Sequence, residues 1–467
     1  MRKIIFILYS IIFSAYLMSE EIFDSLNFNN DNILHPYNSF QRPYLNYKTL
    51  SDLDENKPDY FTIYGPELFS SYNSTVPYGQ NDGALWQGKG INNKLSIGVF
   101  FKYNGLSITF KPELVYSQNL PFDYVTPNSA YSIDLYRDKA GIYGYYGIPS
   151  IDAPQRFGNS YLLNYSWGDS DIRFTWETFT IGFGTQLIWL GPAEINPIIH
   201  SNNAPPYPKF DIGLKKTPIT IFSWYAGDFE TRLWIGYLSE SSFFDKDNSN
   251  DHNMISGLSL CFSPSPIKGL SLFINRTYLS PFSFDNFYTI PKLFIINLKH
   301  GGAQDTWDQR ASIGFNYFLI DSQTNIYCEI GLNDYGPSLD GYIRYPFHSM
   351  VYTLGIKKLS YINEYISNRI LFEISSFEMS QDFQFQWPST FYAHHQITQG
   401  YTNQGQWIGA GNGTGGNSQY LSFEFFSKYW NLNIFFHRSN PDNDYIYSKS
   451  IQTIFNDDIG VRPINDF

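Results

Sequence analysis

Residues 95–114 read LSIGVFFKYNGLSITFKPEL, and this stretch decides the fold class. Apolar side chains fill every second position on both sides of the dipeptide Asn104-Gly105, with Phe100 as the exception. Ser, Gly, Thr and Lys fill the positions between them. A period of two is typical of a β-strand with one apolar and one polar face, and Asn-Gly favours a two-residue hairpin turn. The stretch therefore predicts two antiparallel strands joined by a tight turn.

The same alternation returns along the chain, at residues 311–319, 421–425 and 430–437. A soluble β-sandwich also alternates, so the chemistry of the two faces has to decide between the architectures. In these stretches the apolar face carries no charge, whereas the polar face includes Lys, Glu, Asn and Ser. Lipid outside and water inside explain this contrast. We therefore predict an all-β fold, a large antiparallel transmembrane β-barrel.

The composition agrees with this fold and excludes several others. Of 467 residues, 19% are aromatic and 16% are charged, and the formal net charge is −12. Such dense aromatic residues argue against disorder, and the negative charge argues against a nucleic-acid partner. No apolar run beyond the N-terminus reaches the roughly 18 residues that a membrane helix needs. Aromatic girdles at the two membrane surfaces would account for the Tyr, Phe and Trp content.

The N-terminal region has the pattern of an exported protein. Arg2 and Lys3 precede an apolar stretch at residues 4–18, and Glu20 and Glu21 follow it. Residues 1–19 are therefore predicted to be a secretory signal peptide. A membrane anchor is the alternative, which the shortness of the apolar run and the lack of basic residues after it disfavour. Export through this peptide would lead to the bacterial outer membrane.

Two further segments follow. Residues 20–84 are rich in Asn, Tyr, Pro and Asp, and we expect a short irregular or partly helical N-terminal segment, either periplasmic or a plug. Residues 85–467 are expected to form the barrel. At about 20 residues for each strand with its connection, this length corresponds to about 16–18 strands.

The two cysteines fall on different faces of their expected strands. Cys261 lies opposite the leucines of its stretch, whereas Cys328 shares a face with isoleucines. A disulfide requires Cβ atoms about 3.8 Å apart. Side chains on opposite faces of a barrel wall do not meet this requirement, so we predict two free thiols.

No motif points to a catalytic, metal or cofactor site. Residues 411–416 contain a G-x-G-x-x-G match, but a dinucleotide fingerprint opens a helix, and this one precedes strand-like residues. His394 and His395 are adjacent, so on a strand they would point to opposite faces. We therefore expect no enzymatic activity, no metal ion and no cofactor.

The segment from Trp189 to Lys209 is unlike the strands around it. It is rich in proline and asparagine, follows a strand and contains a Gly-Pro turn, so it predicts a long ordered loop. Such a loop could fold into the lumen and brace the barrel. It could also form a sugar-binding surface, with aromatic rings stacking on sugars and Asn side chains bonding hydroxyl groups. The candidate residues are Trp189, Gly191, Pro192, Asn196, Ser201, Asn202 and Asn203.

At this loop the sequence resembles the Wzi family of capsule assembly proteins. Three other blocks resemble the family in the same order, so that the likeness covers roughly residues 60–467. The first block contributes Asn81, Asp82, Gly83, Trp86, Gly88 and Gly90. The second contributes Asp152, Pro154, Arg156 and Gly158, and the C-terminal block contributes Gly400, Tyr401, Gly405 and Gly409. Leu190, Ala193, Asn403 and Ala410 depart from the residues that the family often has.

The resemblance implies an outer-membrane barrel that binds capsular or other surface polysaccharide and helps to hold it on the cell, without catalysis. The implied partners are this polysaccharide, outer-membrane lipid and the polysaccharide export machinery. Two alternatives from other classes remain. A barrel of this size could be a porin or a substrate-specific channel. The Ser, His and Asp residues of the chain would also allow an outer-membrane lipid hydrolase.

Overall fold

The structure is a computed structural model that describes residues 60–123, 151–245, 247–294, 307–333, 350–363, 366–378, 391–394, 396–427 and 430–440. The predicted signal peptide, residues 1–19, lies outside this part of the chain, as do residues 20–59 of the predicted N-terminal segment. His395 also lies outside it. No helix in the described part is long and apolar enough to cross a membrane.

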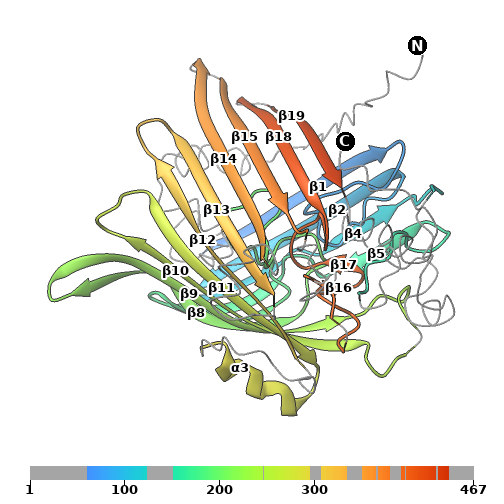
Figure 1. Ribbon diagram of the computed structural model, residues 1–467, viewed down its shortest axis with the longest axis horizontal. Coiled ribbons are helices and arrows are strands. Elements are labelled where there is room, and N and C mark those ends of the chain that lie inside the picture. Colours follow the sequence, from blue (N-terminus) through green and yellow to red (C-terminus); the bar gives the residue numbers. More distant parts are fainter. Residues whose placement is uncertain are drawn as a thin grey trace, which may run out of the picture.

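A single antiparallel sheet of 17 strands forms the wall of a barrel (Figure 1), in agreement with the predicted all-β fold and strand number. Its strands are β1 (Tyr60–Asn73), β2 (Gly90–Tyr103), β3 (Leu106–Phe110), β4 (Glu113–Ser117), β5 (Leu162–Ser166), β6 (Asp171–Trp176), β7 (Phe179–Gly184), β8 (Lys209–Ile221), β9 (Trp224–Ser239), β10 (His252–Pro264), β11 (Leu270–Pro281), β12 (Asp308–Leu319), β13 (Thr324–Asn333), β14 (Met350–Asn363), β15 (Ile366–Ser376), β18 (Asn417–Ser427) and β19 (Asn431–Asn440). A small hairpin, β16 (Thr402–Asn403) and β17 (Gln406–Trp407), and the short helices η2 (Phe284–Tyr288) and α3 (Thr289–Lys292) lie in the connections.

Most strands pair with their neighbours in the sequence. β3 and β4 both pair with β2, one after the other along its length. β6 pairs with β3, and β5 pairs with β4. β3 and β4 therefore form one line of the wall, and β5 and β6 form the next. Beyond the long connection that holds β16 and β17, β15 pairs with β18. The connection after β1 also contacts the last described strand, because Tyr78 stacks on Phe435 and hydrogen-bonds to His437 of β19.

The hairpin at residues 95–114 has the predicted register. Val99 lies opposite Phe110, and Tyr103 lies opposite Leu106 across the Asn104-Gly105 turn. Leu95, Ile97 and Val99 are 37–52% exposed on the outer face. Phe100, the exception to the alternation, is fully buried on the inner face near Tyr64. An apolar outer face and a polar inner face are what a membrane barrel needs.

The wall begins earlier in the chain than the sequence indicates. β1 lies within residues 20–84, which we expected to be a separate segment, and it pairs with β2 over its whole length. The sheet therefore starts at Tyr60 and not at residue 85. Gly65-Pro66 has the sequence of a turn, but in the structure the two residues form an irregularity inside β1. The pairing with β2 shifts register between Tyr64 and Glu67 and then continues.

The connections differ at the two ends of the barrel. Short turns at residues 104–105, 177–178, 222–223 and 320–323 lie at one end, and long connections such as 185–208 and 377–416 lie at the other. In outer-membrane barrels the long connections face the cell exterior. The main hydrophobic cluster is built mostly from these long connections, with Ile188, Ile198, Phe391, Tyr401 and Ile408 among its members. The core of the molecule therefore lies inside the barrel, near its extracellular end.

The two cysteines are free, as predicted. Cys261 is buried on the inner face, whereas Cys328 is partly exposed on the outer face with Ile326 and Ile330.

Candidate functional site

The loop from Trp189 to Lys209 lies inside the barrel and is held by carboxylates of the wall. Glu373 of β15 accepts hydrogen bonds from the backbone N–H groups of residues 194, 195 and 196, at 2.7–3.2 Å. Glu329 of β13 accepts one from Ile198 at 3.2 Å. Thr353 of β14 donates to the Asn196 carbonyl at 2.8 Å. The loop therefore spans the lumen and is anchored to three strands.

The candidate residues at the start of this loop serve its own packing. Trp189 is buried, and its indole N–H donates to the Ala193 carbonyl at 3.0 Å. Gly191 has a φ of +83°, and a side chain there would meet the Glu329 carboxylate. Pro192 is buried beside it. The Asn196 amide donates to Ser418 Oγ of β18 at 3.2 Å. These contacts support the bracing interpretation for this half of the loop.

The second half of the loop joins the sequence blocks to one another. Ser201 Oγ and the Asn203 amide both donate to the Gly409 carbonyl, at 2.5 and 2.9 Å. The Asn202 carbonyl accepts from the Gly83 N–H at 2.6 Å. Asn203 Oδ1 accepts from the Asn81 N–H at 2.7 Å. Three of the four blocks, which are far apart in the sequence, therefore meet here inside the barrel.

The first block closes onto the end of β1 and the start of β2. Gln87 donates to Asp82 Oδ2 at 2.6 Å, and burial raises the pKa of this aspartate to about 6. The Gly88 N–H donates to Ser117 Oγ of β4 at 3.2 Å. Gly90 begins β2 with a φ of +99°. Trp86 packs against Phe157 of the second block, with ring centroids 5.0 Å apart.

The second block is held by buried polar contacts. Asp152 is fully buried and accepts hydrogen bonds from the N–H and the hydroxyl of Ser241, at 2.6 and 2.7 Å. Arg156 donates to the carbonyl and the side chain of Asn119, at 3.0 and 3.3 Å. Pro154 and Phe157 pack against Gly405, and Gly158 faces Phe243. These residues support the loops rather than present free groups to solvent.

The C-terminal block packs in the centre of the hydrophobic cluster that fills the barrel. Tyr401 stacks on Tyr392 at 5.6 Å, lies under the guanidinium of Arg310 and donates to Thr277. Gly400 has a φ of +64°, and the Gly409 carbonyl binds the loop as described above. The stretch at residues 411–416 precedes β18 and no helix, as the sequence indicates.

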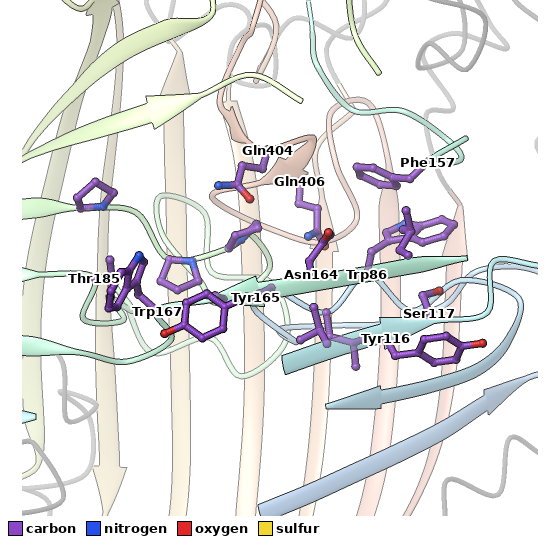
Figure 2. A pocket seen from close by; sticks show the side chains of 18 residues that line it. Trp86, Tyr116, Ser117, Phe157, Asn164, Tyr165, Trp167, Thr185, Gln404 and Gln406 are labelled. Carbon is purple, nitrogen blue, oxygen red and sulfur yellow. The ribbon is translucent and has the colours of Figure 1, made fainter. Parts of the chain in front are cut away.

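A pocket of about 170 Å³ lies between these loops and the wall (Figure 2). Gln404 and Gln406 reach from the β16–β17 hairpin toward Asn164 of β5, with Trp86 and Phe157 at one end and Trp167 and Thr185 at the other (Figure 2). Tyr165 and Pro205, Pro206 and Pro208 complete much of the lining. Aromatic faces beside neutral amides suit a sugar, which has apolar ring faces and many hydroxyl groups.

Most of these pocket residues were missed by the sequence analysis, which singled out Trp86 and placed the prolines within the Trp189–Lys209 loop. Asn164 and Tyr165 lie on β5, which carries no family motif, Trp167 directly follows this strand, and Gln404 and Gln406 flank Gly405. The proline-rich end of the loop, residues 205–208, was the one available signal. It marks a place where the chain cannot continue the sheet.

Three carboxylates lie close together in the connection that follows β9, where the sequence analysis predicted no metal or catalytic site. Oxygens of Glu240, Asp245 and Asp251 all lie within 4.8 Å of one another. Burial and the neighbouring acids raise the pKa of Glu240 to about 9. Burial raises the pKa of Asp152 to about 7, although its bonds to Ser241 oppose the shift.

The hydrolase alternative can be examined at a serine and histidine that touch each other. Ser418 Oγ lies 2.7 Å from His437 Nε2, and Tyr78 lies 2.7 Å from His437 Nδ1. The tautomer of His437 decides whether Nε2 accepts from Ser418 or donates to it, and the Tyr78 hydroxyl can complement either form at Nδ1. Ser418 is also buried and faces the lumen, away from lipid.

Comparisons with known proteins agree with the barrel fold. A family model described as "Capsule assembly protein Wzi" matches residues 70–458. Among solved structures, the chain is similar to Wzi of Escherichia coli, which is described as an outer-membrane protein involved in group 1 capsule assembly and a carbohydrate-binding β-barrel. The identity is 15%, the TM-score is 0.54, and the match covers 84% of this chain and 74% of that one.

Two other outer-membrane proteins match with lower scores. The outer-membrane channel DcaP of Acinetobacter baumannii has 9% identity and a TM-score of 0.28, and the match covers 82% of this chain and 97% of that one. OmpT of Vibrio cholerae has 8% identity and a TM-score of 0.28, with coverages of 82% and 98%. Scores this low carry no argument about function. A search of curated proteins finds no match.

Proposed function

The chain belongs to the Wzi family of capsule assembly proteins, and on this premise we propose that it binds capsular or other surface polysaccharide and holds it at the outer membrane. The observation that carries the proposal is the pocket, where Trp86 and Phe157 offer ring faces and Asn164, Gln404 and Gln406 offer amide groups. Sugars are recognised by this combination of stacking and hydrogen bonding. The protein acts as a lectin-like attachment factor without catalysis.

The packed extracellular end of the barrel supports attachment rather than transport. Ile198, Tyr392, Tyr401 and Ile408 are fully buried in a cluster within the barrel. Hydrogen bonds to Glu329 and Glu373 fix the loop that carries part of this cluster. A porin needs a continuous aqueous lumen. Purified protein in planar bilayers is expected to show no steady conductance, and a steady open current would contradict the proposal.

The remaining parts of the proposal concern the route to the membrane and the partners. Residues 1–19 direct export, and the outer face of the barrel binds outer-membrane lipid. The polysaccharide export machinery delivers the polymer to the long-loop end. Trp189, Asn196, Ser201 and Asn203 act here by shaping the loop inside the barrel, because their side chains donate hydrogen bonds to the protein.

Loss of attachment tests the proposed function. A strain that lacks the protein is expected to shed polysaccharide into the medium, while total synthesis stays unchanged. The wild-type gene restores attachment, and a gene that carries Asn164→Ala and Gln404→Ala does not. Tyr161→Ala is the matched control, because Tyr161 is an exposed neighbour that does not line the pocket. Equal attachment with and without the protein would refute the proposal.

A further inference from the structure

In the described part of the chain, the barrel wall has an opening beside β5. One edge of β5 pairs with β4 along residues 162–166. Among the described strands, the residue-by-residue registers pair β5 with β4 alone, whereas β6, which continues the line of β5, pairs with β3 and β7. β7, which would continue the wall there, ends at Gly184, and the chain then turns inward to the buried residue Ile188. The next strand, β8, begins only at Lys209, opposite Gly184.

Prolines stand opposite this free edge. Residues 205–208 read Pro-Pro-Tyr-Pro, and Pro205, Pro206 and Pro208 line the same pocket as Asn164, Tyr165 and Ser166 of β5. Proline has no backbone N–H and cannot extend a sheet by pairing. Tyr207, the one residue among them with a donor, is buried and binds His200 Nε2 through its hydroxyl. The sequence of the loop therefore keeps the wall open at this place.

The opening lies on the lipid-facing surface. Leu114 and Tyr165 lie opposite each other in the register and are both exposed on the outer face, next to Leu163. Trp167 is 58% exposed and packs edge-on against Tyr165 and Phe110. Both Tyr165 and Trp167 also line the pocket, so the pocket continues to the outside of the barrel. Aromatic residues of this kind favour the boundary between lipid head groups and acyl chains.

The inner part of the pocket is polar and uncharged. Asn164 faces the lumen, opposite the buried Val115, yet it remains exposed because the pocket surrounds it. Gln404 and Gln406 face it from the β16–β17 hairpin (Figure 2). The lining contains no Asp, Glu, Lys, Arg or His. This interior suits the hydroxyl groups of a neutral sugar. The outer end of the pocket at Tyr165 and Trp167, here called the mouth, suits hydrocarbon.

We propose that the pocket takes the sugar of an acylated saccharide sideways from the outer leaflet, while the acyl chains stay in the bilayer beside Tyr165 and Trp167. This inference rests on the proposed function and names the part of the ligand that the pocket holds. A polymer held by its lipid-linked end would remain attached to the membrane while the rest of the chain extends from the cell.

Binding measurements in lipid nanodiscs test the inference with two pairs of probes. One pair is lipopolysaccharide of the host bacterium and its deacylated product, and the other is capsular polysaccharide before and after alkaline deacylation. Each probe competes with a fluorescent, deacylated saccharide. Two variants divide the pocket: Asn164→Ala with Gln404→Ala removes interior amides, and Tyr165→Ala with Trp167→Ala removes the mouth. Tyr161→Ala is the control, and heat-modifiable migration on gels verifies that each variant is folded.

The variants are expected to behave differently. The interior variant should weaken binding of both members of a pair about tenfold or more, and the mouth variant should weaken only the acylated member by about tenfold. The pair that shows this difference identifies the source of the saccharide. A mouth variant that changes both members equally, or neither, overturns the sideways route while leaving polysaccharide binding intact. If no saccharide binds the wild-type protein, the proposed function itself fails.

Discussion

Removing the Glu373 carboxylate should release the loop that closes the barrel. This carboxylate accepts three consecutive backbone N–H groups at residues 194–196 and the Tyr327 hydroxyl at 2.6 Å, and it is almost fully buried. In Glu373→Ala these buried donors lose their acceptor. Each buried donor left unsatisfied costs about 1–3 kcal/mol, so that the loop would lose roughly 4 kcal/mol or more. In Glu373→Gln one acceptor oxygen remains, and the loss should be about half as large.

Two measurements in the folded barrel report this loss. Limited proteolysis should cut Glu373→Ala within residues 189–209 and leave the wild-type protein intact. In planar bilayers the variant should show transient openings that the wild-type protein lacks. Glu67→Ala is the control, because Glu67 faces the lumen and pairs with Lys111 at 3.0 Å but does not contact the loop. A partly exposed pair of this kind contributes at most about 1 kcal/mol. A Glu373→Ala protein that stays closed and resistant to protease would refute the bracing role.

Three further predictions concern local packing, protonation and the thiols. Gly191→Ala should lower the thermal midpoint, because the φ of +83° is strained for alanine and its Cβ would lie 2.7 Å from Glu329 Oε2. Burial raises the pKa of Asp152 to about 7, so the folded state keeps a proton that the unfolded state releases above about pH 4. The thermal unfolding midpoint should therefore fall as the pH rises from about 4 to 7. Asp152→Asn should flatten this pH dependence, and an unchanged slope in the variant would contradict the assignment to Asp152. Thiol labelling of the denatured, unreduced protein should find both Cys261 and Cys328 free, and a missing thiol would contradict the assigned faces.

The alternation of side chains carried most of the fold prediction, because each strand is exposed to two different solvents. It assigned Cys261 and Cys328 to opposite faces correctly from a few neighbours each. It failed at β1, where Gly65-Pro66 interrupts the period and the register shifts within the strand. A local pattern cannot distinguish a turn from a bulge, because the difference depends on whether the chain continues to pair with the partner strand, β2.

The site was less predictable than the fold. The sequence left open whether Trp189–Lys209 braces the lumen or binds sugar, because the same asparagine can bond a carbonyl or a hydroxyl. The partners that decide this, Ser418 for the Asn196 side chain and Gly409 for the Asn203 side chain, lie far away in the sequence. The pocket combines seven separate regions of the chain, and its Asn164 and Gln404 belong to no motif that chemistry alone would select.

The anchoring of the loop by later strands sets an order for the assembly of the barrel. The N–H of Ile198 bonds to the carboxylate of Glu329, 131 residues further along the chain. The Asn196 side chain bonds to the hydroxyl of Ser418, 222 residues further along. Contacts of such separation form late, since the intervening chain must be ordered first. The wall from β13 to β18 must therefore be in place before the loop can settle. We therefore expect an assembly stage in which water still fills the barrel interior. The loop fills this interior only after the last strands have joined the sheet.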